Sequence, residues 1–176
     1  MPAAPQLAAA YQDALSRARW ESVRVAHMRL TPAHPGRRKP RFRVMRWLVF
    51  GSLDYIYVPA ADVDGEASRY VQTLGAELVW KVRGMGTTVA CLRVGEPGPA
   101  ILLSGHLQGP GAILVYRVQD YAATVAQLRA RGIAVHELEI PHGPCATFMM
   151  EAGQRYAVYQ LVRPDAVHLF DGRIDP

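Results

Sequence analysis

Several features that would assign a protein class at once are scarce or missing from this chain of 176 residues. The two cysteines, Cys91 and Cys145, lie too far apart in the sequence for a zinc-site spacing or a disulfide framework. No apolar run reaches the roughly 18 residues that span a bilayer. The first ten residues lack the positive and apolar regions of a secretory signal. We therefore expect a cytoplasmic protein with reduced thiols and no membrane partner.

The net charge of +5 is concentrated near the N-terminus. Residues 1–44 carry nine Lys and Arg against two acidic residues, whereas the rest of the chain carries eleven basic and thirteen acidic residues. The main domain is therefore mildly acidic, and its charge gives no support for nucleic-acid binding. The charge break lies beside Met45, so translation starting at Met45 is one explanation of the basic segment.

Residues 1–50 form a basic N-terminal extension, in which we expect a weak helix and a linker. The helix is predicted over residues 5–20 from apolar residues at i, i+4 spacing: Leu7, Tyr11 and Leu15. Residues 34–43 combine five cations with two prolines and a glycine, a composition typical of a solvated linker. Three roles stay open for the extension: a tail, a helix packed on the domain or a partner subunit, and an anchor for an anionic surface.

The rest of the chain contains an internal repeat, with halves at residues 53–106 and 112–164. Each half starts with a strand pattern, "LDYIYV" or "AILVYRV", and continues with an amphipathic helical stretch and three further β-rich runs. Asp62 and Asp120 are suited to cap the two helices at their N-termini, and Gly75 and Gly132 to end them. Each half is thus β-α-β-β-β, which predicts an α+β fold in which two modules pair to bury their apolar faces.

The repeat resembles the vicinal oxygen chelate superfamily, which includes glyoxalase I, extradiol dioxygenases and bleomycin-resistance proteins. The similarity lies in the order of elements, in "DYIYVPAADV" opening the first half and in "FMMEAGQRYAVYQL" closing the second. It implies that the modules roll a mixed sheet into a cup that holds a small ligand, often over a divalent metal. We expect this domain at residues 51–164, followed by a C-terminal tail at 165–176. The resemblance leaves open whether the modules pair within one chain or between two.

The resemblance also implies where metal ligands would lie, on the first and last strands of each module. The usual histidine position holds Tyr55, its counterpart in the second module is Ile113 (or Ala112 with a one-residue slip), and the usual glutamate position holds Ala157. Divalent metals prefer imidazole, thiolate or carboxylate, and these residues supply none. A substitute set would have to come from residues at turns or strand starts: His106, His136, His142 and Cys145. We expect no metal and no cofactor.

The cup lining is predicted from strand alternation, which puts Tyr55 and Tyr57 on one face and Asp54 on the other. The expected ligand-binding residues are Tyr55, Tyr57, His106, Arg117 and Tyr159. They would give an apolar and aromatic pocket with hydroxyls and one guanidinium. The alternative is that the tyrosines fill the core.

Three histidine- or cysteine-bearing positions invite a catalytic interpretation. His142 and Cys145 in "PHGPC" have the residue types of a nucleophile and its base, but a tight turn without a third orienting group favours a structural role. His106 lies in the connection between the modules, either at the cup rim as a proton-transfer group or as an exposed loop residue.

The main functional hypothesis is a metal-free protein that sequesters or carries an apolar or aromatic small molecule, as bleomycin-resistance proteins do. The alternative is a lyase, isomerase or dioxygenase that uses a rearranged metal site or acid–base chemistry by tyrosine and histidine. A third hypothesis gives the sheet edge or the N-terminal extension a role in assembly. We expect a homodimer with a small-molecule partner.

Overall fold

The computed structural model describes residues 50–84 and 86–176. The helix, the linker and the alternative start that the sequence suggests before residue 50 lie outside the described residues. Module one consists of β1 (Leu53–Pro59), α2 (Val63–Leu74), β2 (Glu77–Gly84), β3 (Thr87–Arg93) and β4 (Ala100–Ser104). Module two consists of β5 (Ile113–Arg117), α3 (Tyr121–Ala130), β6 (His136–Ile140), β7 (Gly143–Met149) and β8 (Arg155–Tyr159). The predicted β-α-β-β-β order is confirmed in both halves.

The two helices begin at the predicted aspartates. An Oδ1 atom of Asp62 accepts the Gly65 N–H at 2.9 Å, and Oδ1 of Asp120 accepts the Ala123 N–H at 2.9 Å. These bonds satisfy donors that the first turn of a helix leaves unpaired. Helix α2 ends at Gly75, which takes the left-handed conformation with φ of 66°.

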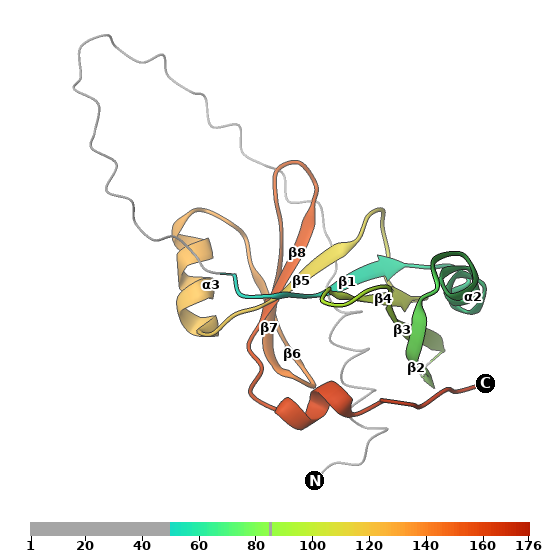
Figure 1. Cartoon of the computed structure of the whole chain (residues 1–176). Helices are drawn as coiled ribbons and strands as arrows, with labels where there is room; N and C mark the ends of the chain where they lie inside the picture. Colours follow the sequence, from blue (N-terminus) through green and yellow to red (C-terminus); the bar gives the residue numbers. More distant parts are fainter. Residues whose placement is uncertain (1–49, 85) are drawn as a thin grey trace, which may run out of the picture.

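The eight strands form one mixed sheet in the order β2-β3-β4-β1-β5-β8-β7-β6. Within each module the first strand pairs in parallel with the last, and the modules meet where β1 pairs antiparallel with β5. In this structure the two modules that pair belong to one chain. The sheet is curled but open, with α2 and α3 at its two ends (Figure 1).

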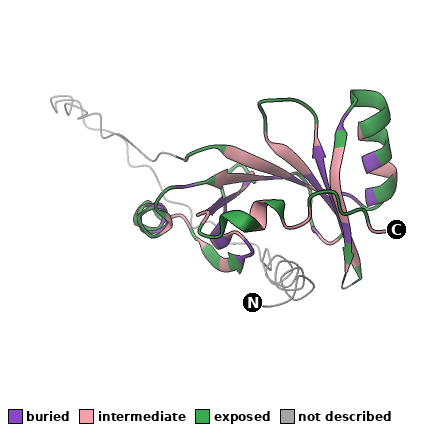
Figure 2. Ribbon diagram, turned by 60° about the horizontal axis from the view of Figure 1, so that its bottom comes forward, coloured by how far each residue is buried: buried purple, intermediate pink, exposed green. Residues whose placement is uncertain are grey.

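The curl separates two packing faces. The concave face carries one apolar cluster that runs through both modules and includes Tyr57, Ile113 and Tyr159. On the convex face, α2 covers a cluster on module one and α3 covers a separate cluster on module two. Figure 2 shows buried residues on the side of α2 that meets the strands and exposed residues on its outer side. No helix within the described ranges is long and apolar enough to cross a membrane.

Residues 105–112 link the modules and are held by a side chain of module two. The guanidinium of Arg155, at the start of β8, donates from Nη1 to the carbonyl of Gln108 at 2.7 Å. Its Nη2 donates to the carbonyls of Pro110, at 3.1 Å, and Gly111. One buried cation thus satisfies three carbonyl groups of a segment that has no regular structure.

The C-terminal residues 163–175, which we call the strap, cross the concave side of the molecule. The strap contains a short 3-10 helix, η1 (Pro164–His168), and ends against the edge of β2, where Ile174 forms a parallel bridge with Lys81. Figure 1 shows it running from the end of module two, beneath the sheet, to module one. The segment that the sequence analysis treated as a tail therefore packs on the domain.

Candidate ligand-binding site

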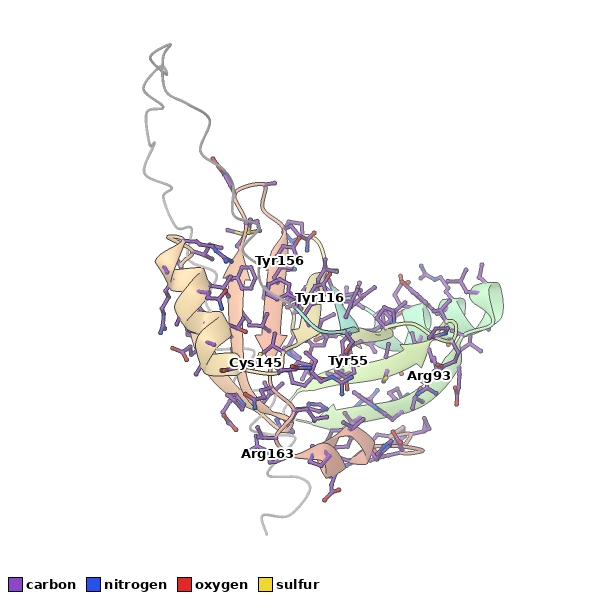
Figure 3. The ribbon with its side chains drawn as sticks, turned by 60° about the vertical axis from the view of Figure 1, so that its left-hand side comes forward. Tyr55, Arg93, Tyr116, Cys145, Tyr156 and Arg163 are labelled. Carbon is purple, nitrogen blue, oxygen red and sulfur yellow. The ribbon has the colours of Figure 1, made fainter. Side chains whose placement is uncertain are left out.

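The centre of the cup is built on the four middle strands, β4, β1, β5 and β8. Their cup-facing residues form two rows across the sheet: Ala100, Tyr55, Val115 and Ala157, then Leu102, Tyr57, Ile113 and Arg155. Most of these side chains are hydrocarbon, and the polar atoms belong to two tyrosines and to the arginine that holds the linker. Figure 3 places Tyr55 near the middle of the sheet, between the two modules.

Tyr55 stands in an aromatic group at this centre. Its ring centroid lies 5.8 Å from that of His142 and 6.4 Å from that of Tyr159, and its hydroxyl lies 3.4 Å from Nε2 of His142. Burial, with a smaller contribution from Cys91, raises the pKa of Tyr55 to about 12. The hydroxyl is therefore protonated at neutral pH and can donate a hydrogen bond to a ligand.

His142 forms a wall of the cup, a position that the turn pattern "PHGPC" did not reveal. Its carbonyl accepts the N–H groups of Val162 and Arg163, which fixes the β6–β7 turn against the chain after β8. Burial lowers the pKa of His142 to about 4, with Asp54 opposing the shift and Arg163 adding to it. The imidazole is neutral, and its buried Nδ1 has no hydrogen-bond partner within the described structure.

The Cys145 thiol does not join His142 as a nucleophile. Burial raises the pKa of Cys145 to about 12, so the thiol stays protonated at neutral pH. Cys145 packs in the concave core, which agrees with the structural role that the sequence favoured for it.

Asp54 contacts the cup, although strand alternation predicted it on the opposite face. A β-bulge between Leu53 and Tyr55 in the β1–β5 pairing breaks the alternation at this point. The Asp54 carboxylate accepts the hydroxyl of Tyr159 at 2.5 Å and pairs with Nε of Arg117 at 3.2 Å. Tyr159 is 1% exposed, and burial together with the bond to Asp54 raises its pKa. Asp54, which strand alternation predicted on the opposite face, thus contacts both Arg117 and Tyr159.

Tyr57 and His106 form a second polar group on module one. Nε2 of His106 lies 3.1 Å from the Tyr57 hydroxyl, and its Nδ1 lies 3.0 Å from Oγ of Ser104. Burial lowers the pKa of His106 and raises that of Tyr57. His106 is half-buried and bonded, so the interpretation of an exposed loop histidine was wrong. Neither Tyr57 nor His106 lines the two pockets of the cup.

Two residues, Tyr55 and Val167, line both of these pockets. The inner pocket, the floor, has a volume of about 40 Å³ and is lined by apolar side chains such as Trp80, Val82 and Phe170, with His142 at one side. The outer pocket, the mouth, has a volume of about 580 Å³. Its lining includes Asp54, Arg93, Arg117 and Tyr159. The cup therefore combines an apolar interior with an opening that carries carboxylates, guanidiniums and hydroxyls.

The residues present do not fit a divalent metal at the positions that the resemblance implies. Tyr55, Ile113 and Ala157 supply no imidazole, thiolate or carboxylate, and the last strand of module one faces the cup with Ala100 and Leu102. In residues 50–84 and 86–176, no group of three or more His, Cys, Asp or Glu is arranged to hold a metal ion. His106 and His142 bond to different tyrosines instead of converging on one point.

Comparison with known proteins gives matches among solved structures. Methylmalonyl-CoA epimerase from Mycobacterium tuberculosis is 21% identical, with a TM-score of 0.54 over 69% of this chain and 98% of that chain. A hypothetical protein, BH1468 from Bacillus halodurans C-125, is 18% identical, with a TM-score of 0.53 over 62% of this chain and 93% of that chain. No family model and no curated protein matches the sequence.

The chain has the vicinal oxygen chelate fold. The resemblance drawn from the repeat is thereby confirmed at the level of the fold, including the mixed sheet built from two β-α-β-β-β modules. Identities of 16–21% carry the fold alone and assign neither ligand nor reaction. In this chain the cup has a tyrosine at its centre and a strap across one half.

Proposed function

We propose that the chain binds an apolar or aromatic small molecule in its cup without a metal ion, in a carrier or sequestration role. The observation that carries this proposal is that Tyr55 lines both the mouth and the floor. A ligand at the mouth meets the Tyr55 and Tyr159 side chains, while Arg117 and Arg93 offer guanidiniums at the rim. A volume of about 580 Å³ is typical of small-molecule pockets, which combine apolar walls with a few polar groups.

The proposal of metal-free ligand binding is tested first by elemental analysis and a thermal-shift screen. Purified protein that retains stoichiometric Zn, Mn, Fe or Ni after dialysis contradicts the metal-free part of the proposal. In the screen, aromatic metabolites and antibiotics are expected to raise the unfolding temperature, because a ligand that binds only the folded state stabilises it.

The first prediction concerns the ring of Tyr55. Tyr55→Ala is expected to weaken binding of the screened ligand about tenfold, which removes about 1.4 kcal/mol of ligand stabilisation, because the ring lines both pockets. Tyr55→Phe separates the ring from its hydroxyl. The matched control is Tyr70→Ala, on α2 and outside the cup. Equal losses in Tyr55→Ala and Tyr70→Ala would remove Tyr55 from the binding site.

A second candidate function is proton transfer without a metal, as in an isomerase. It is favoured by the bond of 2.5 Å between the Tyr159 hydroxyl and Asp54, with Arg117 beside the carboxylate at the mouth. A carboxylate and a protonated hydroxyl in contact have the residue types of a general base and a general acid. One of the solved structures described above is by its name an epimerase, a protein that inverts a stereocentre. Tyr159→Phe that leaves ligand turnover unchanged would exclude this role for the pair.

The homodimer and the cytoplasmic location expected from the sequence stay predictions. Two buried thiols, Cys91 and Cys145, support a reducing compartment, because neither is placed in a disulfide.

A further inference from the structure

The strap is fixed firmly at its start, on module two. Nε of Arg163 donates to the Pro141 carbonyl at 2.5 Å, and its Nη2 bonds to the Glu139 carboxylate at 2.5 Å and to the Ile140 carbonyl. Bonds that involve an ionised partner are the stronger class of hydrogen bonds. Figure 3 shows Arg163 where the chain leaves module two and enters the strap. The strap therefore begins at a clamped residue.

The far end of the strap is held at the edge of β2 by main-chain bonds and by the Asp175 carboxylate, which accepts the Arg83 N–H at 2.9 Å. The Gly172 N–H donates to Val79, the Lys81 N–H donates to Arg173, and the Asp175 N–H donates to Lys81, at 2.8–3.1 Å. Ile174, in the same stretch, is 52% exposed. Solvent-exposed backbone bonds at a chain terminus belong to the parts of a structure that open at low free-energy cost. The two ends of the strap thus differ in how readily they release.

Between these ends, the strap fills the floor of the cup with its own side chains. Ala166, Val167 and Phe170 line the floor together with Trp80, Val82 and Leu102 of module one. The Phe170 ring centroid lies 5.4 Å from that of Trp80 at an interplanar angle of 57°. The remaining volume of about 40 Å³ has room for a few water molecules but not for an organic ligand of ordinary size.

We propose that the floor is a subsite for an aromatic ring and that Phe170 occupies it as a displaceable internal ligand. The ring of a bound molecule enters against Trp80 when the strap lifts from β2 and swings about Arg163. The proposal rests on the proposed function, because it assigns the inner part of the same cup. The part of the ligand that enters the floor is a flat, uncharged ring of about the size of a phenyl group. It contacts Trp80, Val82 and Leu102.

The strap and the ligand then compete for the floor, which raises the apparent dissociation constant of the ligand. When only a fraction of the molecules has the strap lifted, the apparent dissociation constant is the intrinsic one divided by that fraction. A strap that serves only to cover the edge of β2 predicts no such competition.

The wild-type protein is tested with indole as the probe, by amide hydrogen exchange of the full chain. Saturating indole is expected to accelerate exchange at Gly172 and Asp175, whose N–H groups bond to β2. Amides in the β1–β5 pair serve as the internal reference and are expected to keep their rates. Unchanged or slower exchange at Gly172 and Asp175 would overturn the proposal.

Variants of the strap give the second arm of the test. Phe170→Ala and a chain ending at Pro164 are each expected to lower the dissociation constant for indole about tenfold, measured by calorimetry. The matched control is Ile174→Ala, which changes an exposed strap residue outside the floor. Binding that depends on Tyr55 and is insensitive to Phe170 overturns the strap proposal and leaves the proposed function standing. Absence of aromatic binding in the wild type and in all variants overturns both.

Discussion

Module one and module two share a backbone plan but differ in what faces the cup. Tyr55 and Ile113 each lie seven residues before the aspartate that caps the following helix, and Tyr57 and Val115 each lie five residues before it. Module one therefore carries hydroxyls where module two carries hydrocarbon. The strap covers a floor that is lined mainly by module one, whereas Leu138, Ile140 and Leu161 of module two pack in the concave cluster.

The difference shows which features of a duplicated unit its backbone requires. Both copies keep the capping aspartates, because an uncapped helix leaves buried or unpaired N–H groups. Side chains on the cup face carry no such requirement, so the copies differ there in size and polarity. The two copies therefore share a backbone but differ at the cup, with hydroxyls on β1 and β8 and hydrocarbon on β5 up to Arg117 at its end.

The largest expected effect tests the two hairpin turns that occupy equivalent places in the modules. Gly143→Ala is expected to lower the free energy of unfolding by about 3 kcal/mol or more. A Cβ there would lie 2.3 Å from the Gln160 carbonyl oxygen, at a φ of +147°. Gly86→Ala, with φ of +78° and nothing within 4 Å, is expected to cost about 1 kcal/mol. Urea unfolding of both variants measures the difference, and equal losses would show that the turns are equally constrained.

The second prediction compares how His142 of module two and His106 of module one make stability depend on pH. Because the pKa of His142 falls to about 4 on folding, the unfolded chain binds the proton first. The free energy of unfolding should therefore fall as the pH drops from about 6.5 to 4, by up to about 1.4 kcal/mol per pH unit. Solvent contact of this half-buried group reduces the total to about 2 kcal/mol.

His142→Leu is expected to flatten this pH dependence more than His106→Leu does. Burial lowers the pKa of both histidines, so both contribute with the same sign. Denaturant midpoints between pH 4 and 7 provide the measurement, with exposed His168→Asn as the control. A greater flattening by His106→Leu would reverse the ranking of the two modules.

The smallest expected effects compare two buried tyrosine hydroxyls, that of Tyr159 at the mouth and that of Tyr57 on module one. Tyr159→Phe is expected to cost about 1.5 kcal/mol, because Asp54 loses a donor to its charged carboxylate. Tyr57→Phe is expected to cost about 1 kcal/mol, because the partner of its hydroxyl is the neutral His106. Thermal unfolding resolves the two losses. A larger loss for Tyr57→Phe would mean that the polar group of module one contributes more to stability than the pair at the mouth.

The fold was accessible from the sequence because its signals are local and occur twice. Asp62 and Asp120 cap their helices by bonds to residues three positions away, and Gly75 ends α2 through its own backbone. Strand alternation placed Tyr55, Tyr57 and Tyr159 correctly on the concave face, where all three join one cluster. Only the parts of the site that follow from such local rules could be predicted from the sequence.

The remaining parts of the site depend on contacts between distant segments. Asp54 reaches Tyr159 because of a β-bulge, and the strand's residue types give no sign of it. His142 lies beside Tyr55 because the β6–β7 turn folds over the cup. Phe170 meets Trp80 because the strap crosses between modules, and a short 3-10 segment has no periodicity that predicts where it docks.

The bonds from Arg155 to the linker also limit how far the two modules of one chain can separate. The β1–β5 register is nearly two-fold symmetric, so the same pairs can form between module one of one chain and module two of another. Holding residues 108–111 folded back keeps the two modules of one chain within reach of each other. We expect loss of that guanidinium to favour domain-swapped dimers, in which each cup would be assembled from two chains.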